Sequence, residues 1–168
     1  MRANVVKILF ALLIIATISS CDRKSCKDVV CGVDQQCNNG TCICNDGYEG
    51  SNCQTESFQK YIGSYNVTES CYSSVNNFGS YSTYIQADYN YVNRIVITSL
   101  FGYTNATGII HTDQSNQGNY IEIPLQTQGS LSFSGQGTFD PYTNRMSLDL
   151  NYTYNGGSYQ CTHTFYKY

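Results

Sequence analysis

The chain has 168 residues, which is enough for one ordinary domain or two small ones. Its formal net charge is -3, and from Ser57 onward four Lys/Arg stand against six Asp/Glu without any basic cluster. A chain without a basic patch lacks the electrostatic footprint of nucleic-acid binding, so nucleic acid is excluded as a partner. The nine cysteines are many for a reducing cytosol and indicate an oxidising compartment.

Residues 1–20 have the pattern of a secretory signal. Two basic residues, Arg2 and Lys7, come before an uninterrupted apolar run over residues 8–16, and small residues follow the run. The run is far shorter than the roughly 20 residues that a membrane-spanning helix needs. The segment therefore predicts export rather than a membrane span.

The last four residues of this region, Ile18-Ser19-Ser20-Cys21, resemble the lipobox of bacterial lipoproteins. In that family a peptidase cuts before the cysteine, which is then acylated. The resemblance implies a mature chain that begins at Cys21, is tethered through residues 21–25, and lies in the cell envelope, at the outer membrane or cell surface. Eight other cysteines can pair completely, so a ninth thiol is left over. The alternative is an ordinary secreted protein with Cys21 free or in a disulfide.

Six cysteines lie within residues 26–53 with gaps of four, five, four, one and eight residues. Such a short segment cannot bury a core that offsets its chain entropy, so disulfides must replace the core. Six cysteines allow fifteen pairings, and spacing alone does not choose among them.

The stretch "CICNDGYEGSNC", residues 42–53, resembles the signature of an EGF-like domain, and the short spacings are similar to the compact repeats of tenascin-like proteins. The resemblance implies that the first cysteine pairs with the third, the second with the fourth and the fifth with the sixth. The implied bridges are Cys26–Cys37, Cys31–Cys42 and Cys44–Cys53. We expect Gly47 and Gly50 to supply backbone angles that other residues resist.

A metal site is the competing interpretation of clustered cysteines. Zinc sites use CxxC pairs or nearby histidines, and this segment has neither. Calcium-binding EGF-like domains carry acidic or amide residues just before the first cysteine, where this chain has Arg23 and Lys24. No metal and no cofactor is therefore expected.

From residue 57 to residue 168 the pattern changes to the period-two alternation of β-strands, rich in Tyr, Ile, Thr and Phe. "NYIEIPLQ", for example, would place Ile121, Ile123 and Leu125 on one face. Pro124 donates no hydrogen bond to a ladder and indicates an edge or a bulge. Eight strands are predicted, at about 59–70, 81–89, 93–100, 106–112, 119–127, 130–139, 144–154 and 158–167.

Short turns between these strands require antiparallel neighbours, so the sheet is predicted to be a meander. A bridge between Cys71 and Cys161 would tie the first strand to the last, which a closed up-and-down barrel brings together. The architecture resembles a small lipocalin-like, calycin-type barrel, with a β-sandwich as the alternative. An EGF-like module followed by such a domain is similar to a pattern among surface lipoproteins of Bacteroidetes-type bacteria.

No constellation of catalytic residues can be recognised. The two histidines, His111 and His163, are imaginable as a metal pair but are interpreted as one surface and one packed side chain. The carboxylates are scattered, without a local pair suited to acid–base catalysis, and no known catalytic motif is present. These carboxylates are Glu69, Asp88, Asp113, Glu122, Asp140 and Asp149. We therefore expect no enzymatic activity and no catalytic residue.

The tyrosines are the remaining lead, since fifteen of the sixteen follow Ser57 among Asn, Gln, Ser and Thr. This composition is similar to that of adaptable recognition surfaces. The sequence predicts a lipid-anchored, non-enzymatic surface or periplasmic protein, whose β domain binds a protein, a glycan or a small apolar ligand and whose EGF-like unit is a spacer. The alternative is a carrier that holds a small apolar ligand inside the barrel.

Overall fold

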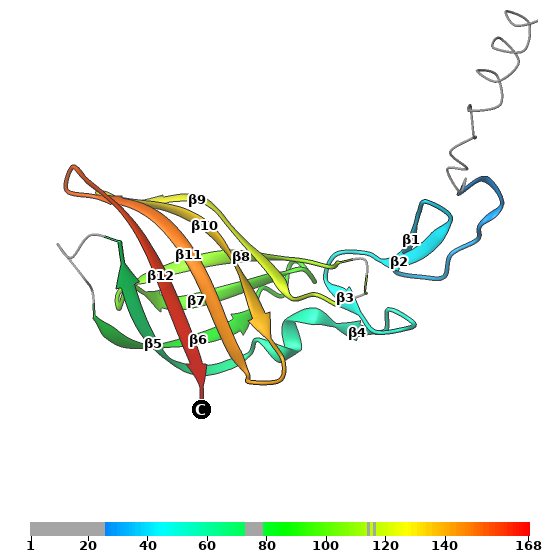
Figure 1. Cartoon of the computed structure of the whole chain (residues 1–168), viewed down its shortest axis with the longest axis horizontal. Helices are drawn as coiled ribbons and strands as arrows, with labels where there is room; N and C mark the ends of the chain where they lie inside the picture. The colour runs from blue at the N-terminus through cyan, green and yellow to red at the C-terminus, as the bar shows by residue number, and fades with distance from the viewer. Residues whose placement is uncertain (1–25, 73–78, 114, 116) are drawn as a thin grey trace, which may run out of the picture.

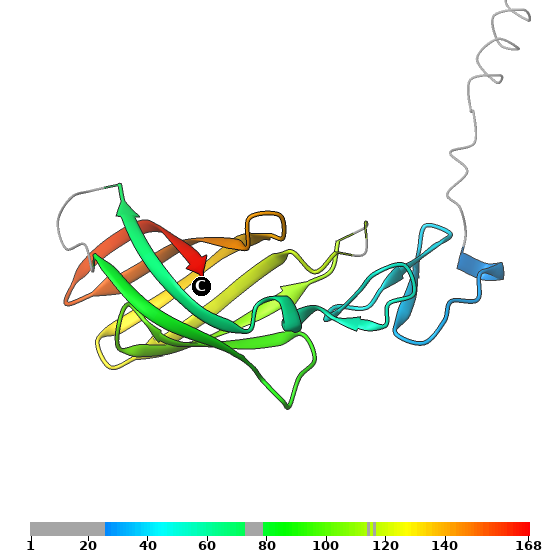
Figure 2. The same cartoon turned by 90° about the horizontal axis from the view of Figure 1, so that it is seen from below.

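The computed structural model of the protein describes residues 26–72, 79–113, 115 and 117–168. A small disulfide-rich module at the N-terminal side adjoins one end of a β-barrel (Figures 1 and 2). The predicted signal of residues 1–20, the tether of residues 21–25 and Cys21 itself lie outside the described residues. Within the described part of the chain, no helix is long and apolar enough to cross a membrane.

The module consists of one short 3-10 helix and two small antiparallel sheets. The elements are η1 (Cys26–Asp28), β1 (Gln35–Asn38), β2 (Thr41–Cys44), β3 (Tyr48–Glu49) and β4 (Thr55–Glu56). Strand β1 pairs with β2, and β3 pairs with β4. Because β4 lies after Cys53, the structural unit extends to Glu56, three residues beyond the predicted EGF-like segment.

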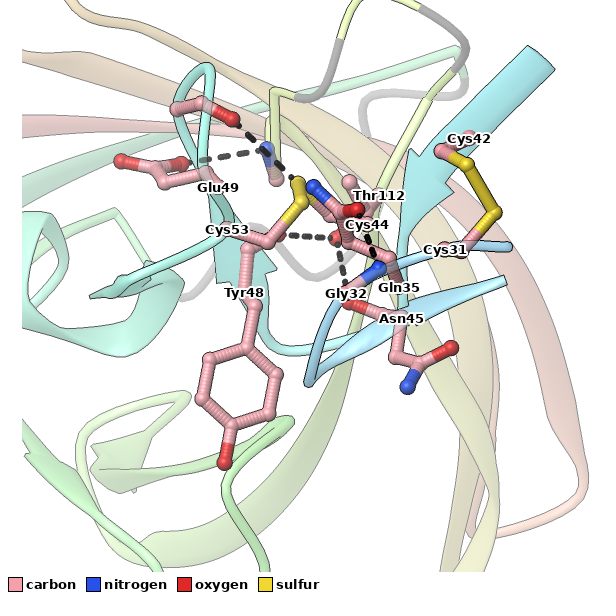
Figure 3. Close-up of a disulfide and its surroundings, with 12 residues drawn as sticks. Cys31, Gly32, Gln35, Cys42, Cys44, Asn45, Tyr48, Glu49, Cys53 and Thr112 are labelled. Atoms are coloured by element: carbon pink, nitrogen blue, oxygen red, sulfur yellow. Dashed lines mark hydrogen bonds between the residues drawn. A yellow bond between two sulfur atoms is a disulfide. The ribbon is translucent and has the colours of Figure 1, made fainter. Parts of the chain in front are cut away.

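Three disulfides hold the module together, and they join the pairs that the EGF-like resemblance implied. The pairs are Cys26–Cys37, Cys31–Cys42 and Cys44–Cys53. Figure 3 shows the Cys31–Cys42 and Cys44–Cys53 disulfides. Gly47 and Gly50 have φ angles of 93° and 89°, which confirms that these positions need the left-handed region that glycine favours.

Eight antiparallel strands form the barrel, and each pairs with its neighbour in the chain. They are β5 (Gly63–Cys71), β6 (Ser80–Ala87), β7 (Arg94–Leu100), β8 (Thr104–His111), β9 (Tyr120–Gln128), β10 (Leu131–Asp140), β11 (Arg145–Tyr154) and β12 (Gly157–Lys167). The last strand pairs with the first, so the barrel is closed. The predicted up-and-down barrel is thereby confirmed, and the sandwich alternative is wrong.

One strand boundary differs from the prediction by more than two residues. The first strand was expected from residue 59, but a 3-10 helix, η2 (Ser57–Lys60), occupies its start and β5 begins at Gly63. Tyr61 between them is fully buried, and its hydroxyl donates a 2.6 Å hydrogen bond to the carbonyl oxygen of Gly118. In the sequence Tyr61 fits the alternation of the first strand, so it was included in that strand. In the structure Tyr61 lies in a turn, and its side chain is buried at the end of the barrel.

The seam between the first and last strands carries the fourth disulfide. Cys71 on β5 lies directly opposite Cys161 on β12, and the two sulfurs are bonded. The bridge joins positions 90 residues apart in the sequence. It therefore fixes covalently the contact that closes the barrel.

Alternating residues of all eight strands fill the barrel interior with a continuous core. Met146, Leu148 and Leu150 of β11 are completely buried, as the alternation predicted. The rings of Phe101 and Phe133 pack edge to face across the interior, 5.6 Å apart. Each fully buried aliphatic or phenylalanine side chain contributes about 1.5–3 kcal/mol through the hydrophobic effect.

Strand β9 departs from the predicted alternation at Pro124. The register with β10 shifts between Phe133 and Gly135, so Pro124 and Leu125 form a β-bulge opposite a single residue. The bulge inverts the side-chain order, and Leu125 is 76% exposed instead of sharing the inner face with Ile121 and Ile123. The bulge that Pro124 indicated is confirmed; the inward position of Leu125 is wrong.

Beyond the bulge, side chains replace the backbone ladder between β8 and β9. The paired registers of these strands cover only the stretch from Ile109 to His111. Farther along, the Gln126 amide accepts from the Thr107 N–H at 2.8 Å and donates to the Thr107 carbonyl at 2.9 Å. The Gln128 amide likewise donates to the Asn105 carbonyl at 2.6 Å. Two glutamine side chains thus connect the strands where their backbones separate.

Replacing Gln126 by alanine should weaken this seam. The N–H and C=O of Thr107 would both lose a partner, at a cost of about 1–3 kcal/mol in the free energy of unfolding. Amide hydrogen exchange should show the Thr107 N–H losing protection at least tenfold. The exposed neighbour Thr127→Ala serves as the control and should leave this amide unchanged. Equal protection in the Gln126 variant and the wild type would contradict the role assigned to the side chain.

Candidate functional site

A long groove lies on the outside of the barrel, across strands β9 to β12 and the end of β5. Two adjoining hollows of about 750 Å³ and 570 Å³ share Asp149 and Gln160 in their walls. We call them together the outer groove. Its polar and aromatic lining consists of Tyr120, Glu122, Ser134, Gln136, Asp149, Asn151, Gln160, Thr162, Ser70 and Tyr72.

The strand registers arrange the groove residues in cross-strand rows. Glu122, Gln136, Asp149, Thr162 and Ser70 face one another successively across five neighbouring strands. Thr162 donates a 2.6 Å hydrogen bond to Asp149, and Tyr120 donates one of 2.8 Å to the side-chain oxygen of Gln136. The floor of the groove is thus an ordered array of hydroxyl, amide and carboxylate groups on rigid strands.

Two backbone features distinguish the barrel wall at this place. Gly135 pairs with the inward-facing Leu150, and a Cβ atom there would overlap the carbonyl oxygen of Asp149, so β10 and β11 can approach closely only because this residue is glycine. Next to it, the bulge at Pro124–Leu125 bends β9 away from a regular pleat. The bulge exposes Leu125 at the edge of the groove.

A second polar cluster lies inside the barrel, near the Cys71–Cys161 disulfide. The side chains of Glu69 and His163 are both fully buried, with 3.6 Å between Glu69 Oε1 and His163 Nε2. Tyr152 donates a 2.9 Å hydrogen bond to Glu69, and the Tyr81 hydroxyl lies 3.0 Å from His163 Nδ1. His163 Nε2 has no hydrogen-bond partner among the described residues.

Burial controls the protonation of this cluster. It lowers the pKa of His163 to about 4 and raises the pKa of the Tyr81 and Tyr152 hydroxyls above their ordinary range. The two phenols therefore stay protonated as donors, and the imidazole is neutral at pH 7. The cluster lies in the closed interior, so it supports the core and offers no surface to a ligand in this conformation.

Glu69 and the sulfurs of Cys71 and Cys161 also lie close enough together to suggest a metal site, with ligand atoms within 4.8 Å of one another. Both sulfurs are bonded to each other, however, so neither is a thiolate that could bind a metal ion. His111 cannot complete a pair with His163, since it lies outside the barrel beside Asp46 of the module.

The module docks on the barrel at His111 and Thr112 and at Gly118. The Thr112 N–H donates to Asp46 at 2.8 Å, and the Thr112 hydroxyl donates to the carbonyl of Tyr48 at 2.9 Å. Figure 3 shows Thr112 beside the Cys44–Cys53 disulfide. His111 lies between two carboxylates, 3.2 Å from Asp46 of the module and 3.0 Å from Glu122 of β9.

An ion pair adds to the same interface. Lys60 Nζ lies 2.5 Å from Glu49 of the module and 2.6 Å from the side-chain oxygen of Asn119. The side chains of Lys60 and Glu49 are only 16% and 17% exposed, and Glu49 also accepts a hydrogen bond from the Gly118 N–H. The module is therefore attached to the barrel by specific polar contacts as well as by the chain.

Substitution of Gly47 by alanine should loosen this attachment. Its Cβ would lie 2.8 Å from the backbone nitrogen of Asn93 in the β6–β7 turn, at a φ angle of 93°. We expect the Thr112 N–H, which bonds to Asp46, to lose protection from hydrogen exchange. Gly50→Ala is the matched control, because Gly50 has a φ angle of 89° but its nearest atom is 3.9 Å away within the module. Similar protection of Thr112 in both variants would contradict close packing at Gly47.

The remaining carboxylates mostly stabilise turns. Asp88, Asp113 and Asp140 each accept hydrogen bonds from backbone N–H groups two to four residues later. Glu122 and Asp149, in contrast, both line the outer groove. Glu122 on β9 and Asp149 on β11 both lie opposite Gln136 of the strand between them, β10. The sequence did not reveal this pair, because 26 positions and a bulge separate the two residues.

Comparisons with protein-family models, with curated proteins and with solved structures find no match for this chain. The disulfide-rich module and the closed eight-stranded barrel are compatible with an EGF-like domain followed by a lipocalin-like one. The barrel fold is compatible with a binding protein, and the outer groove is the feature on which a more specific function can be built.

Proposed function

We propose that the protein is a lipid-anchored, non-enzymatic component of the cell envelope that binds a partner through the outer groove. The module would hold the barrel at a distance from the outer membrane, which Cys21 would anchor. The groove is the observation that carries this proposal. It is the ordered, concave array of polar groups that a binding function requires, and one end of it, at Glu122, adjoins His111 of the interface with the module.

Cysteine pairing supports the anchor. Eight of the nine cysteines form four disulfides, so Cys21 is the one that no intramolecular bridge uses. A cysteine at the end of an apolar signal is the acceptor for acyl chains in the lipobox resemblance. Two or three acyl chains provide stable attachment, since each buried methylene contributes about 0.8 kcal/mol.

The packing of the interior supports an external binding site. A carrier of a small apolar ligand would need space between the strands, whereas one continuous cluster of buried aromatic and aliphatic side chains lies in the described interior. The ring of Phe101 packs against the rings of Phe133 and Tyr152, with centroid distances of 5.6 Å and 4.9 Å. The groove on the outer wall is therefore favoured over the carrier alternative.

The anchor is tested by expressing the full chain in a Gram-negative host. Mass spectrometry of the mature protein should show an acylated N-terminal Cys21 and four disulfides, and the protein should partition into detergent. Cys21→Ser should abolish acylation and membrane partitioning while the four disulfides remain. A wild-type protein with an unmodified Cys21 would overturn the anchor.

The groove is tested with three probes on the mature chain: a glycan array, a phage-displayed peptide library and a fluorescent fatty acid. Asn151→Arg and Gln160→Arg introduce bulk and charge into the groove, and Gln86→Arg on β6 is the matched control outside it. Binding should fall about tenfold, or about 1.4 kcal/mol, in the groove variants only. A ligand that binds all variants equally well, or no binding of any probe, would overturn the proposal.

A further inference from the structure

We infer that the outer groove binds a soluble, uncharged polysaccharide chain, an inference that rests on the proposed binding function. The groove combines amide and carboxylate groups with a tyrosine ring at either end, Tyr120 on β9 and Tyr72 after β5. Sugar hydroxyls both donate and accept hydrogen bonds, and the C–H faces of pyranose rings stack on aromatic rings. The chemistry of the lining matches both properties.

The charge of the groove selects against anionic ligands. Its walls contain the carboxylates of Glu122 and Asp149 and no lysine or arginine. Phosphate, sulfate and uronate groups are bound in proteins chiefly by arginine and lysine side chains and backbone N–H groups. A phosphorylated or uronate-rich glycan would meet negative potential in this groove, whereas neutral sugar hydroxyls can donate to the same carboxylates.

The lining also differs from the centre of a protein interface. Such centres are rich in aromatic residues, methionine and arginine and poor in aspartate, glutamate and serine. Here the middle of the groove is formed by Gln136, Asp149 and Asn151, and the tyrosines stand only at its ends. A small apolar ligand is disfavoured for the same reason, because its pocket would be mostly hydrophobic.

The spacing of the polar groups suits an extended chain of sugars. Adjacent strands lie about 4.8 Å apart, close to the advance per pyranose ring in an extended polysaccharide. The row from Glu122 to Ser70 crosses five strands, or roughly 19 Å along the sheet, which is about four sugar rings.

Several polar groups in the groove are available for such a ligand. The exposed side chains of Asn151 and Gln160 make no hydrogen bond to any of the described residues. The hydrogen bond from Tyr120 uses the oxygen of the Gln136 amide and leaves its NH₂ group directed elsewhere as a donor. Amide donors and carboxylate acceptors thus lie on neighbouring strands of the groove.

The position of the groove indicates the source of the polysaccharide. The module adjoins one end of the barrel (Figures 1 and 2). The groove is lined by outward-facing residues of strands β9 to β12. A chain anchored at Cys21 would hold this wall in the aqueous phase rather than against the lipid. A dissolved polysaccharide can reach the wall there, whereas a glycan fixed to the membrane would lie nearer the module.

The test is calorimetric titration of the mature chain with neutral hexasaccharides of glucose, mannose and xylose, and with a hexasaccharide of galacturonic acid. At least one neutral compound should bind, with affinity that rises with length up to about four rings and changes less than about twofold between low and high salt. Tyr120→Ala and Gln160→Arg should weaken binding about tenfold. Gln86→Arg should not weaken it.

The outcomes separate the ligand class from the binding function. If groove variants lose binding to a displayed peptide or only to the galacturonic acid compound, the groove is a binding site but the neutral polysaccharide is wrong. A parallel titration uses membrane vesicles that carry glycan, and binding to these vesicles alone would show that the soluble source is wrong. If a neutral hexasaccharide binds equally to the wild type and to all groove variants, both the inference and the proposed function of the groove are overturned.

Discussion

Replacing Cys71 and Cys161 together by alanine should lower the free energy of unfolding of the barrel by about 4 kcal/mol. The bridge spans 90 residues, and the entropy that a cross-link removes from the unfolded chain grows with the length of the closed loop. A loss of this size corresponds to a fall in Tm of roughly 15–25 °C. The effect is large because the bridge joins the two strands whose pairing closes the barrel.

Urea unfolding followed by the near-ultraviolet circular dichroism of tyrosine measures this effect. The chain has no tryptophan, and fifteen of its sixteen tyrosines lie after Ser57, so the signal reports mainly on the barrel. The matched control is Cys31→Ala with Cys42→Ala, which opens a bridge of 11 residues in the module. The control should leave the barrel transition unchanged within about 0.5 kcal/mol. A loss below about 1 kcal/mol in the Cys71/Cys161 variant would show that strand pairing alone maintains closure.

Acidification from pH 7 to pH 4.5 should destabilise the barrel by roughly 2.5 kcal/mol through His163 alone. Burial depresses the pKa of His163 in the folded protein to about 4, whereas an unfolded histidine titrates near 6.5. Between these values the unfolded state binds a proton that the folded state does not. The contribution of neutral His163 to the free energy of unfolding is therefore fully present above about pH 6.5. It falls as the pH drops and is lost below about pH 4.

The measurement is the difference in the free energy of unfolding between pH 7 and pH 4.5, for the wild type and for His163→Gln. The variant retains a neutral polar side chain but should lose the share of the pH dependence that comes from histidine. Nuclear magnetic resonance of the folded wild type should show a neutral imidazole down to about pH 4. An equal pH dependence in both proteins, or an imidazole that is charged at pH 6 and becomes neutral in Glu69→Gln, would contradict the assignment.

The module could be predicted almost completely because its structure depends on local covalent constraints. Six cysteines within 28 residues, Gly47 and Gly50 together resemble one known family, and the structure has the disulfide pairs of that family. Strand β3 also pairs with β4, just after the last of the six cysteines. Strand β4 is only two residues long, so it carries no alternation from which a strand could be recognised.

The barrel strands could be predicted as well, because each buries one face and therefore alternates regularly. The predictions were wrong where a turn or a bulge interrupted the alternation of inward-facing and outward-facing residues. Tyr61 is buried from a turn rather than from a strand, and the bulge at Pro124 exposes Leu125 and shifts the register by one residue. The same shift sets Glu122 opposite Gln136. A one-residue error in register would therefore assign different neighbours to every groove position on β9.

The order of the amino acids was thus sufficient to predict the three disulfide pairs of the module, the eight strands and the bridge that closes the barrel, since each follows from a local pattern or from the positions of the cysteines. The outer groove, the buried Glu69–His163 pair and the docking of Asp46 on Thr112 were decided only by tertiary structure. These features join residues from distant strands, and their contacts depend on strand register and on a bulge. The residues near each position in the sequence do not indicate which residue of a distant strand it will contact.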